Sequence, residues 1–379
     1  MHKWQNDVPV KMHSAFVMSR TVIFGFGEEL HQAMAKLKVL VLFGGTSIEY
    51  DESRKSAVAV LNALPSDQYE IIPVGINKKG RWLYFPGDCA EIAADTWDQS
   101  PDCSSAVLSP DPAHRGILIL EDTEYSLKRV DVIFSLLHGQ FGEDGAVQGL
   151  FELSHIPYVG NGILGSALCR SKVYTHLLLN HAGIPTPNWT SVEQRNLNRL
   201  DRECERIEAA LEFPLYVKPS RSDSSAASRI VRNHDELAAA IKLAFTRDTQ
   251  VLVEEYIEGR EFRVGVFGYD LPFASFVGEI IHENDGKTLL IPADLDDSIA
   301  SVMRQTAIEA FCALDCKEIA LLDLYHSARG DFLIGEVNTM PALSEDASYP
   351  RLMADLGMRY PYLLEKLIQQ AMEHADRGM

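Results

Sequence analysis

The sequence predicts an α/β unit built on a parallel sheet, followed by a second unit of the α+β class. Apolar runs typical of strands alternate with segments of helical periodicity up to about residue 160, and the alternation resumes at about residue 171. The chain has 379 residues, which exceeds one average domain. We therefore expect two or three structural units with a ligand-binding cleft between them.

The first element after an extension of undefined structure (residues 1–36) is a buried strand. The apolar run KVLVLFGG ends on Gly44 and Gly45, which predicts a strand followed by a tight turn. The next segment, ESRKSAVAVLNAL, has the apolar spacing of a helix, and Ser53 is its expected N-terminal cap.

The rest of the first unit continues the same alternation. Residues 69–85 predict a β region, whereas residues 88–126 are rich in Asp, Ser and Pro and predict loops and a variable insertion. A further buried strand is expected at 130–139 and a helix at 144–156. Strands that alternate with helices imply a parallel sheet with crossover connections.

The second unit begins with a helical segment and a strand. Residues 213–220 and 228–245 predict a strand and a helix on either side of a serine-rich loop, and residues 249–268 predict two strands. A helix at 295–314 and two strands within 319–340 complete the unit. No internal repeat is present in the sequence.

The charge of the chain excludes several classes of partner. The formal net charge is −19, so a nucleic acid or an anionic membrane surface would be repelled, and small solutes are the expected partners. No apolar run approaches the roughly 18 residues of a membrane span, and Arg20 interrupts the apolar segment near the N-terminus. These features predict a soluble cytoplasmic protein.

The six cysteines lack the paired spacing of a zinc ribbon and the density of a secreted disulfide scaffold, so reduced thiols are expected. Cys312 and Cys316 could share a helix face. Two thiols without neighbouring histidines favour buried packing over a metal site.

The strongest candidate site consists of Asp323, Glu336 and Asn338. Alternation along a strand puts Glu336 and Asn338 on one face, and antiparallel pairing of adjacent strands can bring Asp323 beside them. Two carboxylates and an amide oxygen are hard ligands that suit Mg²⁺. The alternative is a solvated hairpin with ordinary polar positions, but the apolar flanking residues favour a metal site, because buried carboxylates without a cation are costly.

Two lysines and two glutamates are candidates for nucleotide binding. Lys218 lies in a strand that is otherwise buried, where an anionic ligand is a reasonable counter-charge, and Lys172 opens the second unit. The alternative for each is a surface lysine. Glu254 and Glu261 flank the second strand pair and could accept hydrogen bonds from an adenine amino group or ribose hydroxyls.

Two glycine-rich segments of the sequence indicate different things about ligand binding. The loop LHGQFGEDGAVQG permits close backbone approach to a small ligand, although a tight turn with a helix cap explains it equally well. The segment GGTSIEYDES does not match the dinucleotide-binding fingerprint.

These motifs, in this order, resemble the D-alanine:D-alanine ligase family of the ATP-grasp superfamily. The resemblance covers about residues 38–372. It is carried by six segments in register: VLFGGTSIEYDES, LLHGQFGEDGAVQGLFELSHIPYVGNGILGSALCRSK, LLLNHAGIPTP, FPLYVKPS, VLVEEYIEGREF and GEVNTMPAL.

The resemblance implies an ATP-grasp fold preceded by a Rossmann-like N-terminal domain. It predicts an N-terminal substrate domain at 37–160, a central subdomain at 161–255 and a C-terminal subdomain at 256–379. ATP would lie between two of them, with Mg²⁺ or Mn²⁺ bridging its phosphates. Members of the family are commonly dimers, so a homodimer is expected.

The resemblance also assigns roles by matched position. Glu49 would hold the ammonium group of the first amino acid, His138 lies in the substrate loop, and Glu49 and Ser224 are the candidate catalytic residues. Asp323, Glu336 and Asn338 would be the metal ligands. The matched nucleotide-binding residues are Lys172, Lys218, Ser225, Glu254, Glu255, Ile257 and Glu261.

The loop expected to cover the phosphates departs from the family pattern. Asp223 and Ala227 replace the two glycines of the family's GSSxG segment, although Ser224 and Ser225 remain. An aspartate about 4 Å from a phosphate oxygen would cost on the order of 4 kcal/mol at an effective dielectric constant near 20. The side chain of Asp223 should therefore point away, or the nucleotide should bind weakly.

Other departures concern mainly the amino-acid half of the expected site. Leu321 stands where the family keeps an arginine that contacts the reacting oxygens, and Ala347 stands where a serine should bind the second substrate's carboxylate. A shorter segment at 281–291 replaces a long loop. Tyr50 and Ala342 replace a histidine and a glycine of the family, and compensating residues could be Arg221, His282 or Lys287.

The family reaction is phosphorylation of a carboxylate by ATP, followed by attack of a second amino acid's amine on the acyl phosphate. The resemblance therefore predicts an ATP- and Mg²⁺-dependent ligase that joins two amino acids. Two alternatives remain: a diverged dipeptide or specialised-metabolite ligase with another second substrate, and a nucleotide-binding homologue without turnover. Leu321 replaces the arginine of the family. A cationic side chain from elsewhere at that place would favour an active ligase, and its absence would favour a homologue without turnover.

Overall fold

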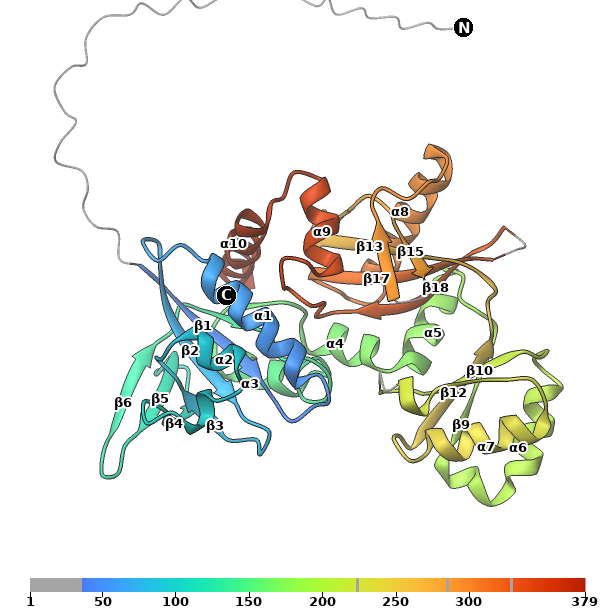
Figure 1. Cartoon of the computed structure of the whole chain (residues 1–379), viewed down its shortest axis with the longest axis horizontal. Helices are drawn as coiled ribbons and strands as arrows, with labels where there is room; N and C mark the ends of the chain where they lie inside the picture. The colour runs from blue at the N-terminus through green and yellow to red at the C-terminus, as the bar shows by residue number, and fades with distance from the viewer. Residues whose placement is uncertain (1–35, 223–224, 284–285, 328–329, 379) are drawn as a thin grey trace, which may run out of the picture. The chain divides into compact units, whose positions relative to one another are not determined.

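The computed structural model describes residues 36–222, 225–283, 286–327 and 330–378 (Figure 1). The residues from Leu37 onward cluster as one compact unit. Within it, the strands form sheets of eight, four and six members. The extension predicted at residues 1–36 lies outside the described residues except for Lys36.

The eight-stranded sheet has the order β6-β5-β4-β3-β2-β1-β7-β8. Strands β2, β1, β7 and β8 pair in parallel, as predicted, whereas the strands from β3 to β6 pair antiparallel. The strands are β1 (Leu37–Gly44), β2 (Tyr69–Ile76), β3 (Trp82–Tyr84), β4 (Ser104–Leu108), β5 (Gly116–Leu120), β6 (Tyr125–Arg129), β7 (Val132–Ser135) and β8 (Tyr158–Val159). The helices of this part are α1 (Tyr50–Ala63), α2 (Cys89–Ala93), η1 (Trp97–Gln99) and α3 (Ala146–Ser154).

The prediction of loops over residues 88–126 is wrong. This segment contains α2, η1 and the strands β4 and β5, which extend the sheet together with β6. Short runs such as SSAVL and GILIL alternate between buried and less buried positions, which is the pattern of a half-covered antiparallel strand. The segment has more residues in polar turns than in these short apolar runs. Its average composition is therefore that of a loop and does not indicate the strands.

Ser53 is not the N-cap of α1. The helix begins at Tyr50, and Glu49 occupies the N-cap position. The Ser53 hydroxyl is completely buried, accepts a hydrogen bond from the Gly44 N–H at 2.8 Å and donates to the Leu136 carbonyl at 2.6 Å. It therefore connects α1 with the end of β1 and with the loop after β7. The site residues Glu49 and Gly139 follow these two strands.

The four-stranded sheet has the order β11-β10-β12-β9. Its apolar core packs against α6 and α7. Strands β10 and β12 pair antiparallel and bring Lys218 and Glu254 to neighbouring positions. The elements are α4 (Ile163–Arg170), α5 (Lys172–His181), β9 (Trp189–Glu193), η2 (Gln194–Arg199), α6 (Leu200–Glu208), β10 (Leu215–Pro219), η3 (Ser225–Ala227), β11 (Arg229–Val231), α7 (His234–Ala244) and β12 (Gln250–Glu255).

The six-stranded sheet has the path β16-β15-β13-β17-β18, with β14 paired to β13. Helix α8 covers it, and the two strands predicted within residues 319–340 are present as β17 and β18, with β18 at the edge of the sheet. The elements are β13 (Gly259–Gly268), β14 (Phe273–Ala274), β15 (Gly278–Glu283), β16 (Gly286–Leu290), α8 (Asp297–Ala313), β17 (Glu318–Ser327), β18 (Phe332–Asn338), α9 (Ser348–Asp355) and α10 (Tyr360–Gly378).

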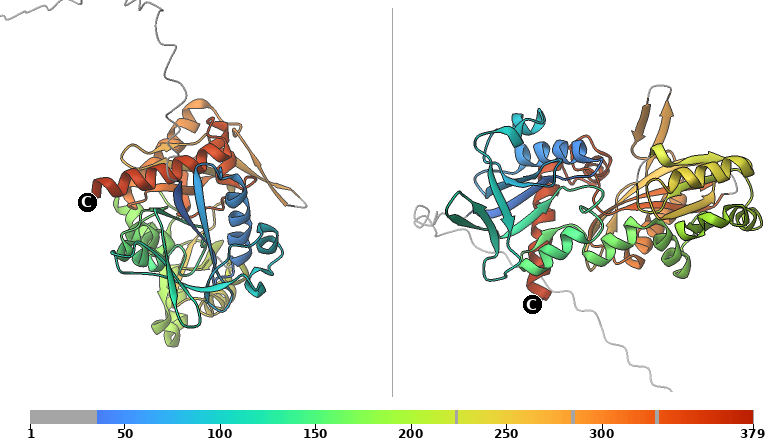
Figure 2. Two further views of the ribbon diagram at one scale, coloured as in Figure 1. Left: turned by 90° about the vertical axis from the view of Figure 1, so that its left-hand side faces the viewer. Right: turned by 90° about the horizontal axis from the view of Figure 1, so that it is seen from below.

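The C-terminal helix α10 returns to the eight-stranded sheet, where it packs against β7, β8 and α1 (Figure 2). Leu363 and Leu367 share one buried cluster with Val39 and Phe134 of the sheet. The two ends of the described chain therefore stabilise one core. None of the helices within the described ranges is long and apolar enough to cross a membrane. The predicted subdomain boundaries at 160 and 255 stay predictions.

Candidate active site

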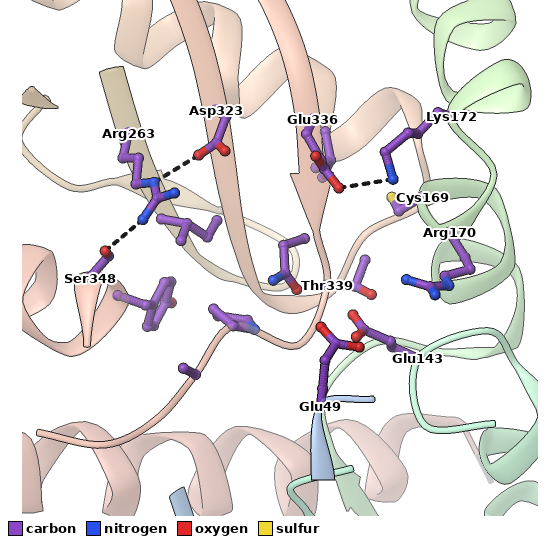
Figure 3. Close-up of a pocket in the computed structure, with 16 residues that line it drawn as sticks. Glu49, Glu143, Cys169, Arg170, Lys172, Arg263, Asp323, Glu336, Thr339 and Ser348 are labelled. Atoms are coloured by element: carbon purple, nitrogen blue, oxygen red, sulfur yellow. Dashed lines mark hydrogen bonds and ion pairs between the residues drawn. The ribbon is translucent and has the colours of Figure 1, made fainter. Parts of the chain in front are cut away.

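A cavity of about 280 Å³ lies where β17, β18, the start of α9, the junction of α4 and α5 and the N-terminus of α1 meet (Figure 3). We call it the central cavity. Its volume suits a small ligand or part of a larger one. Its charged lining residues are Glu49, Glu143, Arg170, Lys172, Arg263, Asp323 and Glu336.

The predicted carboxylate pair is built as expected from the alternation of two adjacent strands. Asp323 of β17 lies opposite Glu336 of β18, and Leu321 lies opposite Asn338 in the same antiparallel register. All four residues line the central cavity. The predicted approach of Asp323 to Glu336 and Asn338 is thus present in the structure.

The surroundings of these residues suit a divalent cation. Burial raises the pKa of Asp323 to about 6, with Arg263 opposing the rise and Glu336 adding to it. The Asn338 Oδ1 accepts the Met340 N–H at 2.9 Å and keeps a second lone pair. Asp323 pairs with Arg263 and Glu336 with Lys172, and the two adjacent carboxylates form with the Asn338 amide oxygen a donor set that fits Mg²⁺.

Lys172, at the first position of α5, lies at the rim of the carboxylate pair. Its Nζ lies 3.2 Å from Glu336 Oε1 (Figure 3), and its side chain is 7% exposed. The Lys172 N–H donates to the Ser220 carbonyl at the end of β10, which fixes the start of the helix. The lysine therefore provides a positive charge directly beside the candidate metal ligands.

The opposite side of the central cavity carries two carboxylates, and Arg170 lies near them (Figure 3). Glu49 and Glu143 line it, and both contact Gly139: the Gly139 N–H donates to Glu143 Oε1, and a Cβ at Gly139 would collide with Glu49 Oε2. Gly139 has φ +71° and is required here because a side chain would displace the Glu49 carboxylate. The glycine-rich loop thus permits close approach, although the group that approaches it is Glu49.

His138, predicted in the substrate loop, is buried and is not one of the residues that line the central cavity. Its Nδ1 donates to the Met340 carbonyl at 2.9 Å, since a carbonyl can only accept. Burial lowers the pKa of His138 to about 4, so the ring is neutral near pH 7. Its Nε2 is buried and has no hydrogen-bond partner among the described residues.

Lys218 and Glu254 form a closed ion pair. Lys218 Nζ lies 2.7 Å from Glu254 Oε1, and His176 Nε2 lies 3.0 Å from Oε2. Burial opposes ionisation of Glu254, but Lys218 and His176 outweigh it, so the pKa of Glu254 is lowered. The Lys218 ammonium therefore has a carboxylate partner within the protein, supplied by β12 across the sheet, and its predicted contact with an anionic ligand stays a prediction.

The predicted adenosine residues are divided between different places. Glu255 and Ile257 line a cavity of about 450 Å³ together with Phe213 and Leu333, and we call it the edge pocket. Glu261, by contrast, lies on β13, where its carboxylate accepts hydrogen bonds from the side chains of His282 at 2.9 Å and Lys287 at 3.4 Å.

The serine-rich loop is described only in part. Asp223 and Ser224 lie outside the described residues, and Ser225 begins η3. Arg221, before this loop, forms an ion pair with Asp248 at 2.5 Å and lines a neighbouring cavity that shares Glu49 and Arg170 with the central cavity. The loop predictions therefore stay predictions.

Tyr50, which replaces the family's histidine, is part of the N-terminal core. Its hydroxyl donates to Asp95 Oδ1 at 2.9 Å and accepts from Trp97 Nε1 at 3.1 Å. Burial raises the pKa of Tyr50 far above its usual value. The substitution is explained by packing against Trp97, which is completely buried.

Sequence reasoning missed three charged residues of the central cavity: Glu143, Arg170 and Arg263. Arg263 pairs with Asp323 across β13 and β17. None of the proposed substitutes Arg221, His282 and Lys287, all within the described ranges, lines this cavity. An arginine in the otherwise apolar run FRVGVF was the signal that could have indicated Arg263.

Models of two protein families match the chain. The family described as D-ala D-ala ligase N-terminus matches residues 38–161, and that described as D-ala D-ala ligase C-terminus matches residues 178–369. Together they cover both the side with Glu49 and Glu143 and the carboxylate hairpin of the central cavity.

Curated relatives and solved structures agree with these matches. The chain is 39% identical to the D-alanine--D-alanine ligase of Thermoanaerobacter sp. (strain X514), over 90% of this chain and 98% of the relative. It is 37% identical to the vancomycin/teicoplanin A-type resistance protein VanA of Enterococcus faecium, over 90% of this chain and all (100%) of the relative.

The structure of the VanG D-Ala:D-Ser ligase from Enterococcus faecalis superimposes with a TM-score of 0.83 at 34% identity, over 89% of this chain and 99% of that one. The D-alanine-D-alanine ligase from Coxiella burnetii gives a TM-score of 0.79 at 29% identity, over 90% and 96%. With both halves of the chain matched and relatives aligned over nearly their whole length, the chain belongs to the D-alanine:D-alanine ligase family, whose members are ATP-dependent ligases of the ATP-grasp fold.

Proposed function

We propose that this chain uses ATP and Mg²⁺ to phosphorylate the carboxylate of one amino acid and then joins it to the amine of a second amino acid. The observation that carries the proposal is the construction of the central cavity. It combines the carboxylates Glu49 and Glu143 on one side with the paired carboxylates Asp323 and Glu336 and with Lys172. A substrate that has both an ammonium group and a carboxylate fits between those sides.

Glu49 would bind the ammonium group of the first amino acid. Its carboxylate lies close to Gly139, and the N–H of the same glycine donates to Glu143. Two carboxylates attract a cationic group strongly when water is largely excluded. Such binding would direct the substrate's own carboxylate toward the hairpin of β17 and β18.

Asp323, Glu336 and Asn338 would hold Mg²⁺, or Mn²⁺, next to the phosphates of ATP. When bound, the ion would neutralise charge on the phosphoryl group that is transferred. Lys172 would add a fixed positive charge, because its ammonium group lies beside Glu336 and α5 holds it there. Such preorganised charge favours a transition state in which negative charge develops on oxygen.

The remaining nucleotide assignments are part of the same proposal. Lys218 and Ser225 would contact phosphates, while Glu254, Glu255, Ile257 and Glu261 would contact adenosine. The edge pocket supports the assignment of Glu255 and Ile257, because it is a cavity of suitable size beside Phe213. Ser224 as a catalytic residue, His138 as a substrate residue and a homodimer rest on the family resemblance alone, and a cytoplasmic location rests on the apolar pattern of the sequence.

A second candidate function is a ligase that joins the first amino acid to a different amine. It is favoured by the wall of the central cavity around Leu321, Ala342 and Tyr349, where Arg263 approaches from a neighbouring strand. The amine-donating substrate would meet this wall. Because this wall departs from the family pattern at Leu321 and Ala342, it predicts a different second substrate. The metal-binding side keeps the residues of the family.

ADP release by the purified protein tests both candidates. The protein is incubated with ATP and Mg²⁺ and with D- and L-amino acids singly and in pairs, and products are identified by mass spectrometry. Release with D-alanine alone supports D-alanyl-D-alanine synthesis, and release with another pair supports the second candidate. ATP binding without ADP release for any pair would contradict both and favour a homologue without turnover.

A further inference from the structure

Arg263 is a charged residue in the central cavity to which the proposed phosphoryl transfer gives no role. It lies on β13, opposite Asp323 of β17. Its Nε donates to Asp323 Oδ1 at 3.0 Å, and its Nη1 donates to Ser348 Oγ at 2.9 Å (Figure 3). The guanidinium group is thus fixed between the carboxylate hairpin and the first residue of α9.

The two contacts leave hydrogen-bonding capacity on the guanidinium. An arginine has five N–H donors, and within the described part of the chain its Nη2 makes no hydrogen bond. The side chain is 26% exposed, so part of it faces the cavity. A fixed fork of unused donors fits a carboxylate, which can accept two parallel N–H groups.

The neighbours of Arg263 leave room for such a ligand. Leu321, Ala342 and Pro341 line the same cavity and carry no charge. Ala347, the N-cap residue of α9, makes no side-chain hydrogen bond to the first turn. The positive end of this eight-residue helix therefore adds to the attraction that Arg263 exerts on an anion.

The position of Arg263 also separates it from the first substrate. Glu49 and Glu143 attract a cation, whereas Arg263 contacts Ser348 of α9 (Figure 3). An amino acid whose ammonium group binds Glu49 has no need of a second cation beside α9. The substrate that supplies the amine does, because its carboxylate takes no part in the reaction and must be neutralised.

We infer that Arg263, positioned by Asp323 and assisted by Ser348, binds the carboxylate of the amine-donating substrate. This inference rests on the proposed function. Arg263 thus restricts that substrate to amines that carry a carboxylate, as amino acids do. It fulfils the role expected of the serine that Ala347 replaces, but it does so from β13.

A competition between two acceptors tests the inference. D-Alanine and D-alaninamide are supplied together at equal concentration with ATP and Mg²⁺. The amide lacks a carboxylate that could be phosphorylated, so it enters a product only as the amine donor. Mass spectrometry gives the ratio of the dipeptide to its amide, and this ratio cancels any loss of folded protein. If the pair screen finds another acceptor, that amino acid and its amide are used.

The unsubstituted protein is expected to favour the carboxylate over the amide by about 10- to 100-fold, the range for a hydrogen bond to a charged group. Arg263→Gln should reduce the preference to within about 3-fold of unity, and Arg263→Lys should retain part of it. Ser348→Ala should reduce it less than Arg263→Gln does. Arg260→Gln is the control, because Arg260 lies on the same strand but pairs with Glu279 at 2.6 Å.

An unchanged preference in Arg263→Gln, with both products reduced equally, would overturn the inference and leave Arg263 as a counter-ion of Asp323. Absence of both products from the unsubstituted protein would instead contradict the proposed function. In that case saturation-transfer NMR compares the binding of D-alanine and of D-alaninamide. The measurement uses the Glu49→Gln variant with and without the substitution of Arg263. D-Alanine should bind better than its amide only while Arg263 is present, and equal binding would refute the inference.

Discussion

Lys172 and Lys218 were both predicted to meet phosphates, but they lie in different surroundings. Each forms an ion pair with a glutamate, Lys172 at 3.2 Å and Lys218 at 2.7 Å. The side chain of Glu336, the partner of Lys172, is 39% exposed to the cavity, whereas that of Glu254, the partner of Lys218, is 5% exposed. A similar contact can therefore be open to a ligand in one place and part of the protein core in another.

The different exposure of the two ion pairs affects how much each contributes to the stability of the fold. An ion pair whose carboxylate is partly open to a cavity contributes less to stability, because solvent that reaches this carboxylate screens the attraction. A buried pair contributes through the penalty that follows when one partner is removed and the other is left without a counter-charge. We expect changes at Lys218 and Glu254 to affect folding in addition to the nucleotide contacts proposed for them, and changes at Lys172 and Glu336 to affect mainly chemistry.

The largest effect on stability is expected for Glu254→Gln. It leaves the Lys218 ammonium buried beside a neutral amide and should lower the free energy of unfolding by about 3–5 kcal/mol. Urea denaturation followed by circular dichroism measures the change. Glu255→Gln, one residue further along β12 and more exposed, is the matched control and should change stability by less than about 0.5 kcal/mol. Equal stability of both variants would show that the buried pair is not essential.

Glu336→Gln should lower the rate of ADP release by at least about 10²-fold, because a charged metal ligand becomes neutral. Its stability should stay close to that of the unsubstituted protein. The comparison variant is Glu309→Gln on α8, an exposed residue that bonds to Gln305 outside the cavity. An unaltered rate in Glu336→Gln would refute the metal assignment.

Acid should weaken the ion pair of Lys218 and Glu254. The pKa of Glu254 is lower in the folded than in the unfolded protein, so the folded state binds fewer protons near that pKa. The stability from this group is complete above pH 4.5, the ordinary carboxyl value, and is lost as pH falls through the lower folded value. The stability difference between the protein and Glu254→Gln should therefore shrink below pH 4.5. A difference that does not change down to pH 3 would contradict this origin.

The smallest effect on stability is expected for Lys172→Gln. Its partner is partly exposed, so the change should stay within about 1 kcal/mol. ATP affinity, measured by calorimetry with ATP and Mg²⁺, should nevertheless fall by about 10-fold, because a charge beside the phosphates is lost. A variant that loses several kcal/mol of stability would place Lys172 with Lys218 and remove the distinction between the pairs.

Arg263 and the β17–β18 hairpin show why part of the site was readable from the sequence. Asp323, Glu336 and Asn338 lie on strands that follow each other in the sequence, so alternation and antiparallel pairing are enough to bring them together. Arg263 lies 60 residues before Asp323, and its approach depends on β13 being the neighbour of β17. Strand order in a sheet follows from the packing of the whole unit, which local periodicity does not contain.

The same distinction applies to the fold. The continuous apolar runs of β1 and β7 predicted buried parallel strands, and the structure confirms them. The strands β4 and β5 within residues 88–126 were missed because they are short and alternate between buried and exposed positions, so their composition approaches that of loops.

The sequence by itself determined the alternation of strands and helices, the ligase family through motifs in fixed order, and the carboxylate hairpin. Only the tertiary structure decided that Lys218 is neutralised within the protein while Lys172 faces a cavity, and that an arginine from another strand stands beside Leu321. The physical reason is that electrostatic energy depends on distance and burial in three dimensions. The sequence shows that a residue is charged, but it does not show which residue pairs with it or how far water reaches it.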